Sequence, residues 1–145
     1  MAFDLDKLFE KSDLIPVIIQ DAEDKMVLML GFTNREAVEL TLKTKTAWFW
    51  SRSRGKLWNK GETSGNFLHV VKMVTDCDTD TLLYFCHADG PTCHTGSRSC
   101  FFNTIMEDEA RILLNRWSRS SPSAARNPWR GPTPAIFLKR DWTRS

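Results

Sequence analysis

Residues 76–101 read DCDTDTLLYFCHADGPTCHTGSRSCF and bring together side chains that can bind metal ions. Asp76, Asp78 and Asp80 stand at alternate positions, with Cys77 between the first two. Because side chains alternate between the two faces of an extended chain, we expect the aspartates to point one way and Cys77 the other. The segment is therefore predicted to contribute to two different metal sites.

The two faces differ in the metal ion that they would prefer. Three carboxylates form an oxygen-only site suited to Mg²⁺, whereas a thiolate prefers the softer Zn²⁺. The predicted thiol partners of Cys77 are Cys93 and Cys100, because both lie in loops rich in Gly, Ser and Thr, where no hydrophobic core would hold them. Cys86 lies inside the apolar run 82–86 and is assigned to the core.

The number of thiol ligands decides whether a zinc site could be catalytic. Structural zinc sites are normally closed by four protein ligands, whereas catalytic sites keep one position for water. Three cysteines predict an open site, and participation of Cys86 would close it. A polar turn with solvated aspartates is the alternative for 76–80. An EF-hand is excluded, because that loop requires Gly and Glu where this chain has Thr81 and His87.

The composition indicates one small domain with a charged tail. The chain has 145 residues, of which 41% are hydrophobic. Its net charge of +2 combines +5 from Ser118 onward with −3 over the first 117 residues, so we expect no general nucleic-acid binding by the body. No apolar run could span a membrane, and the N-terminus does not resemble a signal peptide. We therefore expect a cytoplasmic protein with reduced thiols and no membrane partner.

Hydrophobic periodicity predicts a strand-rich α+β fold. We expect a domain over residues 1–106, followed over 107–145 by a helix and a basic tail that is ill-ordered from Ser118 to Pro134. Residues 135–138 are apolar enough to dock on another surface. The expected helices cover 4–11, 33–44 (with Thr33 in a capping box) and 107–117, and the expected strands cover 14–20, 26–31, 46–52, 70–74 and 81–86.

Two polar segments could bind anions. Arg52 lies in the segment 51–56, in which hydroxyl and guanidinium groups alternate, and such groups are good phosphate ligands. In the next segment, Gly61 and Gly65 frame Glu-Thr-Ser, so that backbone N–H groups could turn inward around an anion. Ordinary solvent-exposed turns are the alternative for both. The candidate substrate-binding residues are Arg52, Lys60, Thr63 and Ser64.

Three motifs together resemble those of the phosphoribosyl-AMP cyclohydrolases, enzymes of histidine biosynthesis. They are WNKGETSGN at 58–66, DCDTD at 76–80 and GPTCHTG at 90–96, which is followed by SCF at 99–101. Weaker similarity extends over residues 14–102. Nothing after Phe102 resembles the pyrophosphohydrolase domain that follows in many members.

The resemblance implies an intertwined homodimer with metal sites at the subunit interface. One chain would supply Cys77 to a zinc ion, and the other would supply Cys93 and Cys100. The aspartates match the magnesium ligands of the family; they are Asp76, Asp78 and Asp80.

The resemblance also implies phosphoribosyl-AMP as the substrate. A phosphoribosyl group on N1 makes the adenine ring cationic, and a zinc-activated water could attack C6 and open the N1–C6 bond. Three thiolates weaken the acidity of zinc, so a general base should help. His94 is the first candidate for this base, and Glu62 is the second.

Two other functions compete with this hypothesis. The first is a zinc-stapled, non-enzymatic module that binds RNA or a partner through the basic tail, with Cys86 as a fourth zinc ligand. The second is a zinc nucleobase deaminase, although its His-x-Glu and Pro-Cys-x-x-Cys motifs are absent. A deaminase would release ammonia, whereas ring opening releases none.

Overall fold

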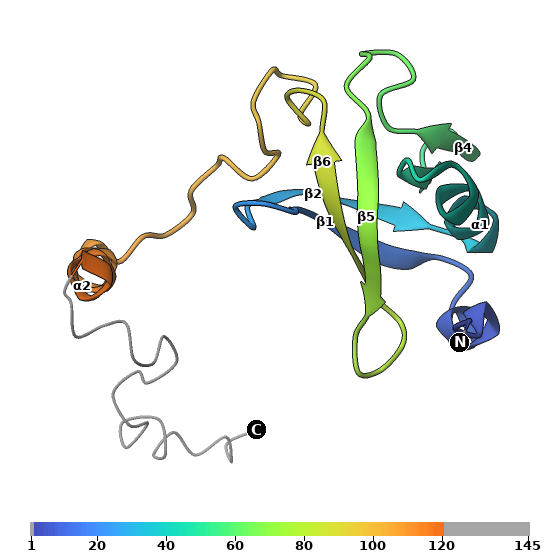
Figure 1. The fold of residues 1–145 in the computed structure, drawn as a ribbon, viewed down its shortest axis with the longest axis horizontal. Coiled ribbons are helices and arrows are strands. Elements are labelled where there is room, and N and C mark those ends of the chain that lie inside the picture. Colours follow the sequence, from blue (N-terminus) through green and yellow to red (C-terminus); the bar gives the residue numbers. More distant parts are fainter. Residues whose placement is uncertain (1, 121–145) are drawn as a thin grey trace. The chain divides into compact units, whose positions relative to one another are not determined.

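The computed structural model describes residues 2–120, with side chains as far as Trp117. Contacts divide the chain into two units, with the boundary between Asn103 and Thr104. The N-terminal unit is a small, strand-rich α+β domain, as the sequence predicts (Figure 1). Each unit is described by itself.

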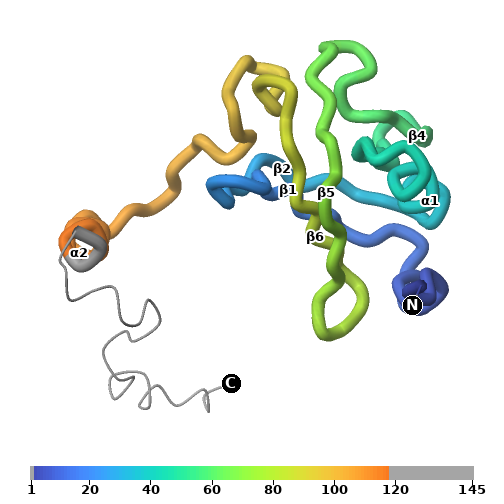
Figure 2. The backbone as a smooth tube through the Cα atoms, in the orientation of Figure 1, coloured from blue at the N-terminus to red at the C-terminus, as the bar shows by residue number. Residues whose placement is uncertain are grey.

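Two hairpins lie side by side in the main sheet, whose strand order is β2-β1-β6-β5. The first hairpin pairs β1 (Ile15–Asp21) with β2 (Val27–Thr33). The second pairs β5 (Leu68–Thr75) with β6 (Leu82–Ala88). Strands β1 and β6 run parallel at the centre and join the two hairpins, whose paths can be followed in Figure 2. All four strands were predicted from the apolar runs.

Smaller elements complete this unit. They are the 3-10 helix η1 (Leu5–Phe9), the helix α1 (Arg35–Thr44) and a separate two-stranded sheet of β3 (Trp48–Ser51) and β4 (Lys56–Asn59). Strand β4 was not predicted, because its mixed sequence KLWN has no clear alternation.

The N-terminus of α1 begins one residue later than predicted. Thr33 is the buried last residue of β2, and Asn34 is the cap, since its Oδ1 accepts a hydrogen bond from the backbone N–H of Ala37 at 2.9 Å. Because Thr33 is part of the sheet, the N-cap is the next residue, Asn34, whose side chain can accept a hydrogen bond from the first turn of the helix. The helix ends as predicted at Thr44, followed by Lys45 in the left-handed conformation.

The core lies against one face of the main sheet. Buried and partly buried residues alternate along β1 and along the first part of β6, as expected for strands with one covered face. Cys86 is fully buried in this core, which confirms the prediction made for it. The central buried side chains are Ile15, Val17, Ile19, Leu82, Tyr84 and Cys86.

Gly31 allows β3 to approach β2. A Cβ atom built on Gly31 would lie 2.6 Å from Cδ1 of Phe49, whose ring is fully buried. Any larger residue at position 31 would displace the Phe49 ring and with it β3. Strand β3 is followed, after a short turn, by β4. Phe49 packs in turn on Trp58, with 5.1 Å between ring centroids, which positions the start of the loop that follows β4.

The C-terminal unit contains α2 (Glu109–Ser120), close to the helix predicted over 107–117. Its apolar side chains are largely exposed, including Leu113 at 62% and Leu114 at 65%. The helix continues through Ser120, so it includes the first three residues of the segment expected to be ill-ordered. The rest of that segment, and the apolar residues 135–138, lie outside the described residues. Among the described helices, none is long and apolar enough to span a bilayer.

Candidate active site

One cavity joins two of the motifs. It has a volume of about 410 Å³, and it lies between the loop that follows β4 and the loop that follows β6. Six of the predicted site residues therefore line one space. They are Lys60, Glu62, Thr63, Ser64, Cys93 and His94.

The first of these loops turns tightly after β4. The backbone N–H of Glu62 donates to the carbonyl of Asn59 at 3.0 Å, and that of Gly65 donates to the carbonyl of Gly61 at 2.8 Å. Gly61 has a φ of 103°, and a Cβ atom there would lie 2.6 Å from the backbone nitrogen of Phe67. The turn thus requires glycine at position 61 and directs the side chains of residues 62–64 to the cavity.

The two loops are held together by Asn66. Its side-chain amide donates to the carbonyl of Pro91 at 3.3 Å. A Cβ atom on Gly90 would lie 2.5 Å from Oδ1 of Asn66, so only glycine permits this close approach. A backbone bond from Asp89 to Phe67, at 3.0 Å, supports the same junction.

The second loop brings the thiols of Cys93 and Cys100 close enough to influence each other's ionisation. The Thr95 hydroxyl donates to Sγ of Cys93 at 3.1 Å. Hydrogen bonds from the Thr95 hydroxyl and backbone, and then from Cys100, lower the pKa of Cys93, whereas burial and then the neighbouring Cys93 raise the pKa of Cys100. The Lys60 ammonium acts on both thiols and favours their ionised forms. A thiol pair with a cation beside it is a suitable start for a metal site.

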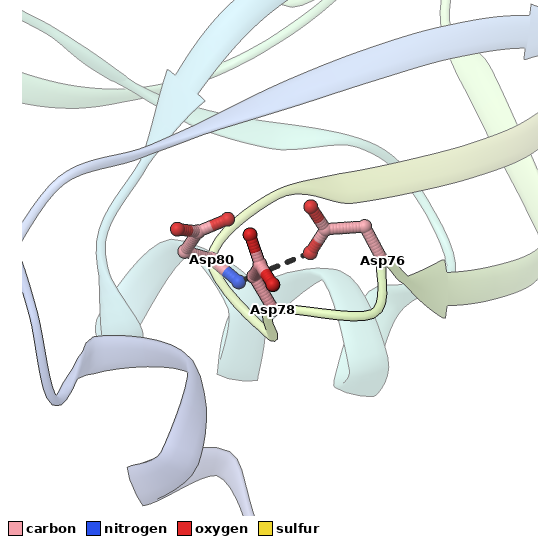
Figure 3. A group of neighbouring side chains, drawn as sticks. All are labelled: Asp76, Asp78 and Asp80. Atoms are coloured by element: carbon pink, nitrogen blue, oxygen red, sulfur yellow. Dashed lines mark hydrogen bonds between the residues drawn. The ribbon is translucent and has the colours of Figure 1, made fainter.

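The three aspartates converge in the turn between β5 and β6 (Figure 3). One oxygen from each of Asp76, Asp78 and Asp80 lies within 4.8 Å of the others. Oδ1 of Asp76 accepts hydrogen bonds from the backbone N–H groups of Asp80, at 3.1 Å, and Thr81, at 3.2 Å. This geometry is compatible with a cation site.

The reason given for this convergence was wrong, because residues 76–80 form a turn and not an extended strand. Thr79 has a φ of 56°, in the left-handed region, and Asp76 closes the turn through its carboxylate. The aspartates meet because the chain reverses direction between β5 and β6.

Cys77 lies in the same turn, before β6, whereas Cys93 and Cys100 lie in the loop that follows β6. Figure 1 shows this turn and this loop at opposite ends of the strand. Strand β6 has seven residues, which corresponds to about 23 Å in an extended chain. Among the described residues, one group of three potential metal ligands has its ligand atoms close together, and it consists of the three aspartates. No cysteine belongs to this group. Cys77 therefore does not join the thiol pair within one chain.

Arg52 lies in a neighbouring cavity of about 440 Å³. The central carbon of its guanidinium group is 3.8 Å from the centroid of the Phe32 ring, a cation–π contact. Arg54 and Trp58 line both cavities, and they form part of the boundary between them. Sequence reasoning did not single out Arg54, because the alternating Ser and Arg pattern gives no means of choosing between the two arginines.

Sequence reasoning also missed two polar residues of the first cavity. Asn59 Oδ1 and Thr92 Oγ1 are buried, and among the described residues neither atom has a hydrogen-bond partner. Thr92 is only 2% exposed. Asn59 and Thr92 both lie inside quoted motifs, but only the structure shows that these atoms are buried and unpaired.

Comparison with known proteins identifies the family. The family model described as "Phosphoribosyl-AMP cyclohydrolase" matches residues 29–102. A protein of that name from Archaeoglobus fulgidus is 55% identical over 103 residues, which cover 71% of this chain and 95% of the relative.

Two further relatives carry the same name. The one from Clostridium botulinum strain Kyoto is 56% identical over 95 residues, covering 66% of this chain and 86% of the relative. The one from Brucella anthropi is 51% identical over 108 residues, covering 73% of this chain and 77% of the relative. The chain therefore belongs to the phosphoribosyl-AMP cyclohydrolase family.

Proposed function

We propose that this chain opens the adenine ring of phosphoribosyl-AMP by hydrolysis of the N1–C6 bond, a step of histidine biosynthesis. Family membership supports the proposed reaction. One structural observation supports its location in the cavity between the two loops. In a single cavity, the turn around Gly61 and the loop of Cys93 bring Lys60, Glu62 and His94 together. Cation, carboxylate, imidazole and thiol groups at one site provide the binding and proton-transfer groups that the hydrolysis requires.

The thiol pair fits a zinc ion, because soft sulfur ligands suit it and the two thiols lie near each other on one loop. Cys93 and Cys100 would hold the ion, with Cys77 from a second copy of the chain. The distance along β6 supports this proposal, since Cys77 cannot reach the pair in its own chain. The active form is thus an intertwined homodimer whose metal sites lie at the subunit interface. When bound, Zn²⁺ supplies Lewis acidity that makes water a better nucleophile at neutral pH.

The chemical step needs a proton acceptor beside the attacking water. The oxygen of water bonds to C6, the N1–C6 bond breaks, and a proton passes to the departing nitrogen. We assign the acceptor to His94, which lines the cavity next to Cys93, and Glu62 is the second candidate. Because water adds without loss of the exocyclic amine, no ammonia is released.

The two cavities suit a substrate with two phosphoribosyl groups. Lys60, Thr63 and Ser64 offer a cation and two hydroxyls on one side of the shared residues, and Arg52 offers a guanidinium group on the other. We propose that these residues bind the two phosphates. Asn59, with its unpaired buried oxygen, could accept a hydrogen bond from the substrate.

The aspartate cluster is the proposed magnesium site. Three carboxylates with one oxygen each inside 4.8 Å repel one another, and a divalent cation would relieve that repulsion. Figure 3 shows that the cluster presents these groups on a turn. The proposed ligands are Asp76, Asp78 and Asp80.

The catalytic unit is proposed to comprise residues 1–106. The relative from Archaeoglobus fulgidus is matched over 95% of its length by 71% of this chain. The C-terminal helix and tail, residues 107–145, are then an addition to the reacting unit.

The zinc-stapled binding module receives no support. Cys86, its required fourth ligand, has no exposed surface and belongs to the core cluster of β1 and β6. A structural site closed by four sulfurs therefore lacks its last ligand in this fold.

The direct test is turnover by the purified full-length chain. Phosphoribosyl-AMP is supplied with zinc and magnesium, and both the opened-ring product and ammonia are measured. We expect product without ammonia, and loss of activity after chelation of the metals. Ammonia in equal amount to the product would indicate a deaminase instead, and absence of any reaction in the metal-loaded dimer would overturn the proposal.

A further inference from the structure

We propose that Arg98 is a positioning residue, which ties the loop of Cys93 and Cys100 to the β1–β2 hairpin and thereby keeps the two thiols together. Arg98 lies on the loop, two residues before Cys100. Its guanidinium group contacts two carboxylates at the hairpin end, Asp21 and Asp24.

The two carboxylates are oriented by hydrogen bonds within the hairpin turn, independently of Arg98. Oδ1 of Asp21 accepts from the backbone N–H groups of Glu23, at 2.8 Å, and Asp24, at 3.1 Å. Oδ1 of Asp24 accepts from the backbone N–H of Met26 at 3.0 Å. In each residue one oxygen is used by the hairpin turn itself, and the other is left for an external cation.

Arg98 occupies both of the remaining oxygens. Its Nη1 lies 2.5 Å from Oδ2 of Asp24, and its Nη2 lies 3.3 Å from Oδ2 of Asp21. The side chain of Asp21 is only 13% exposed, so its carboxylate is weakly solvated and favours a fixed cation. A lysine could not contact two separate carboxylates with the same planar geometry.

The backbone of Arg98 binds the first arm of the loop, which carries Thr92 and Cys93. The carbonyl of Arg98 accepts from the backbone N–H of Thr92 at 3.2 Å, and that of Ser97 accepts from Cys93 at 3.1 Å. Arg98 thus links the arm that carries Cys93 to the hairpin through one residue.

The arm of Cys100 has its own attachments to β2. The Ser99 hydroxyl donates to the carbonyl of Val27 at 2.7 Å, and the backbone N–H of Cys100 donates to Leu28 at 2.8 Å. Without the Arg98 side chain, the Cys100 arm would remain on β2, while the Cys93 arm would lose its attachment through Asp21 and Asp24. The spacing between the two thiols should therefore become less fixed.

Loss of this attachment should not unfold the domain. Arg98 and Asp24 are each 50% exposed, and exposed ion pairs contribute little to global stability. Asp21 is less exposed, but it keeps its two backbone hydrogen bonds when Arg98 is replaced. The effect is therefore expected on the geometry of the site rather than on folding. Its consequence for zinc rests on the proposed function, whereas its consequence for the thiol pair does not.

The test compares Arg98→Gln with the control Arg35→Gln in the full-length chain. Arg35 forms exposed ion pairs with Asp6 and Glu39, away from the cysteine loop. One sample of each metal-free protein is titrated with phenylarsine oxide, which captures two neighbouring thiols. A separate sample is titrated with zinc in competition with a chromophoric chelator. We expect Arg98→Gln to weaken both affinities about tenfold, in the range found for residues that orient metal ligands, while Arg35→Gln leaves both unchanged.

Further variants separate the possible outcomes. Arg98→Lys should recover part of the loss, and Asp24→Asn should reproduce it and serve as the probe if Arg98→Gln does not fold. Wild-type affinities in a folded Arg98→Gln protein would overturn the proposal. Arsenical capture without any zinc binding by the wild type would refute the zinc site, and the arsenical titration alone would then decide the role of Arg98.

Discussion

Asn66 donates its side-chain amide to the carbonyl of Pro91 at 3.3 Å, and this bond joins the two loops that enclose the cavity. The residues lie 25 positions apart in the sequence. Gly90 makes the approach possible, because a Cβ atom there would collide with Asn66. Two motifs that are separate in the sequence therefore form one site.

The first prediction tests this junction. Asn66→Ala should lower kcat/KM about fivefold, the equivalent of one lost hydrogen bond, because the loops no longer keep their spacing. Steady-state kinetics measure the effect. Ser12→Ala, which loses the exposed bond to the carbonyl of Leu14, is the control and should keep full activity. Equal kinetics for both variants would show that the loops need no link through Asn66.

The second prediction tests the shared zinc site. Cys77→Ala and Cys93→Ala homodimers should each be inactive and lack zinc, because each site loses one of its three sulfurs. A mixed dimer would retain one intact site, with Cys77 from one chain and Cys93 from the other. Random pairing after co-expression should therefore restore about a quarter of wild-type activity. No recovery in isolated mixed dimers would contradict the shared site.

Most of the fold could be predicted from local patterns. Strands β1, β2, β5 and β6 appear as apolar runs, and in β1 and β6 alternate residues enter the core. Strand β4 was missed, because only its pairing with β3 makes the short sequence a strand. The N-cap of α1 is Asn34 and not the predicted Thr33, because Thr33 belongs to β2. This pairing depends on the tertiary structure and cannot be predicted from a local motif.

The site was less predictable than the fold. Residue types and spacing selected the thiols and the aspartates, but the reason for the aspartate cluster was a turn and not strand alternation. The unpaired oxygens of Asn59 and Thr92 follow from burial, which depends on the packing of loops distant in sequence. The hairpin contact of Arg98 likewise joins residues 74 positions apart.

The third prediction concerns the general base. His94→Gln should retain zinc, because the thiols are untouched, but it should lose about a hundredfold in kcat at neutral pH. The pH–rate profile should also lose the ionisation attributed to the base. Glu62→Gln is the comparison variant. If the profile of His94→Gln matched that of the wild type, the role of base would pass to Glu62.

The fourth prediction concerns the core thiol. Burial raises the pKa of Cys86 from 9.0 to about 12, so the folded protein holds this proton at pH values where the unfolded chain has lost it. Its contribution to stability is fully present below about pH 9 and is lost as the pH rises toward 12.

The measurement is denaturant unfolding at several alkaline pH values. Cys86→Ala should show a shallower loss of unfolding free energy with rising pH than the wild type. Burial, the largest cause of the raised pKa of Tyr84, is present in both proteins, whereas the smaller contribution of Cys86 to that pKa is lost in the variant and changes the slope in the same direction. Ser12→Ala, at an exposed position that does not ionise, should leave the slope unchanged. Identical slopes for Cys86→Ala and the wild type would show that this thiol ionises equally in both states.

The last prediction separates cation binding from turn structure in the aspartate cluster. Nζ of Lys11 lies 3.5 Å from Oδ2 of Asp80, where its positive charge would compete with the proposed magnesium ion. Lys11→Met should therefore strengthen Mg²⁺ binding about threefold, whereas Asp78→Asn should weaken it about tenfold. Asp76→Asn should in addition lower the melting temperature, because its carboxylate also closes the turn. Calorimetric titration with Mg²⁺ measures the affinities. Unchanged affinity in both Lys11→Met and Asp78→Asn would mean that the turn, and not a metal ion, explains why the three carboxylates converge.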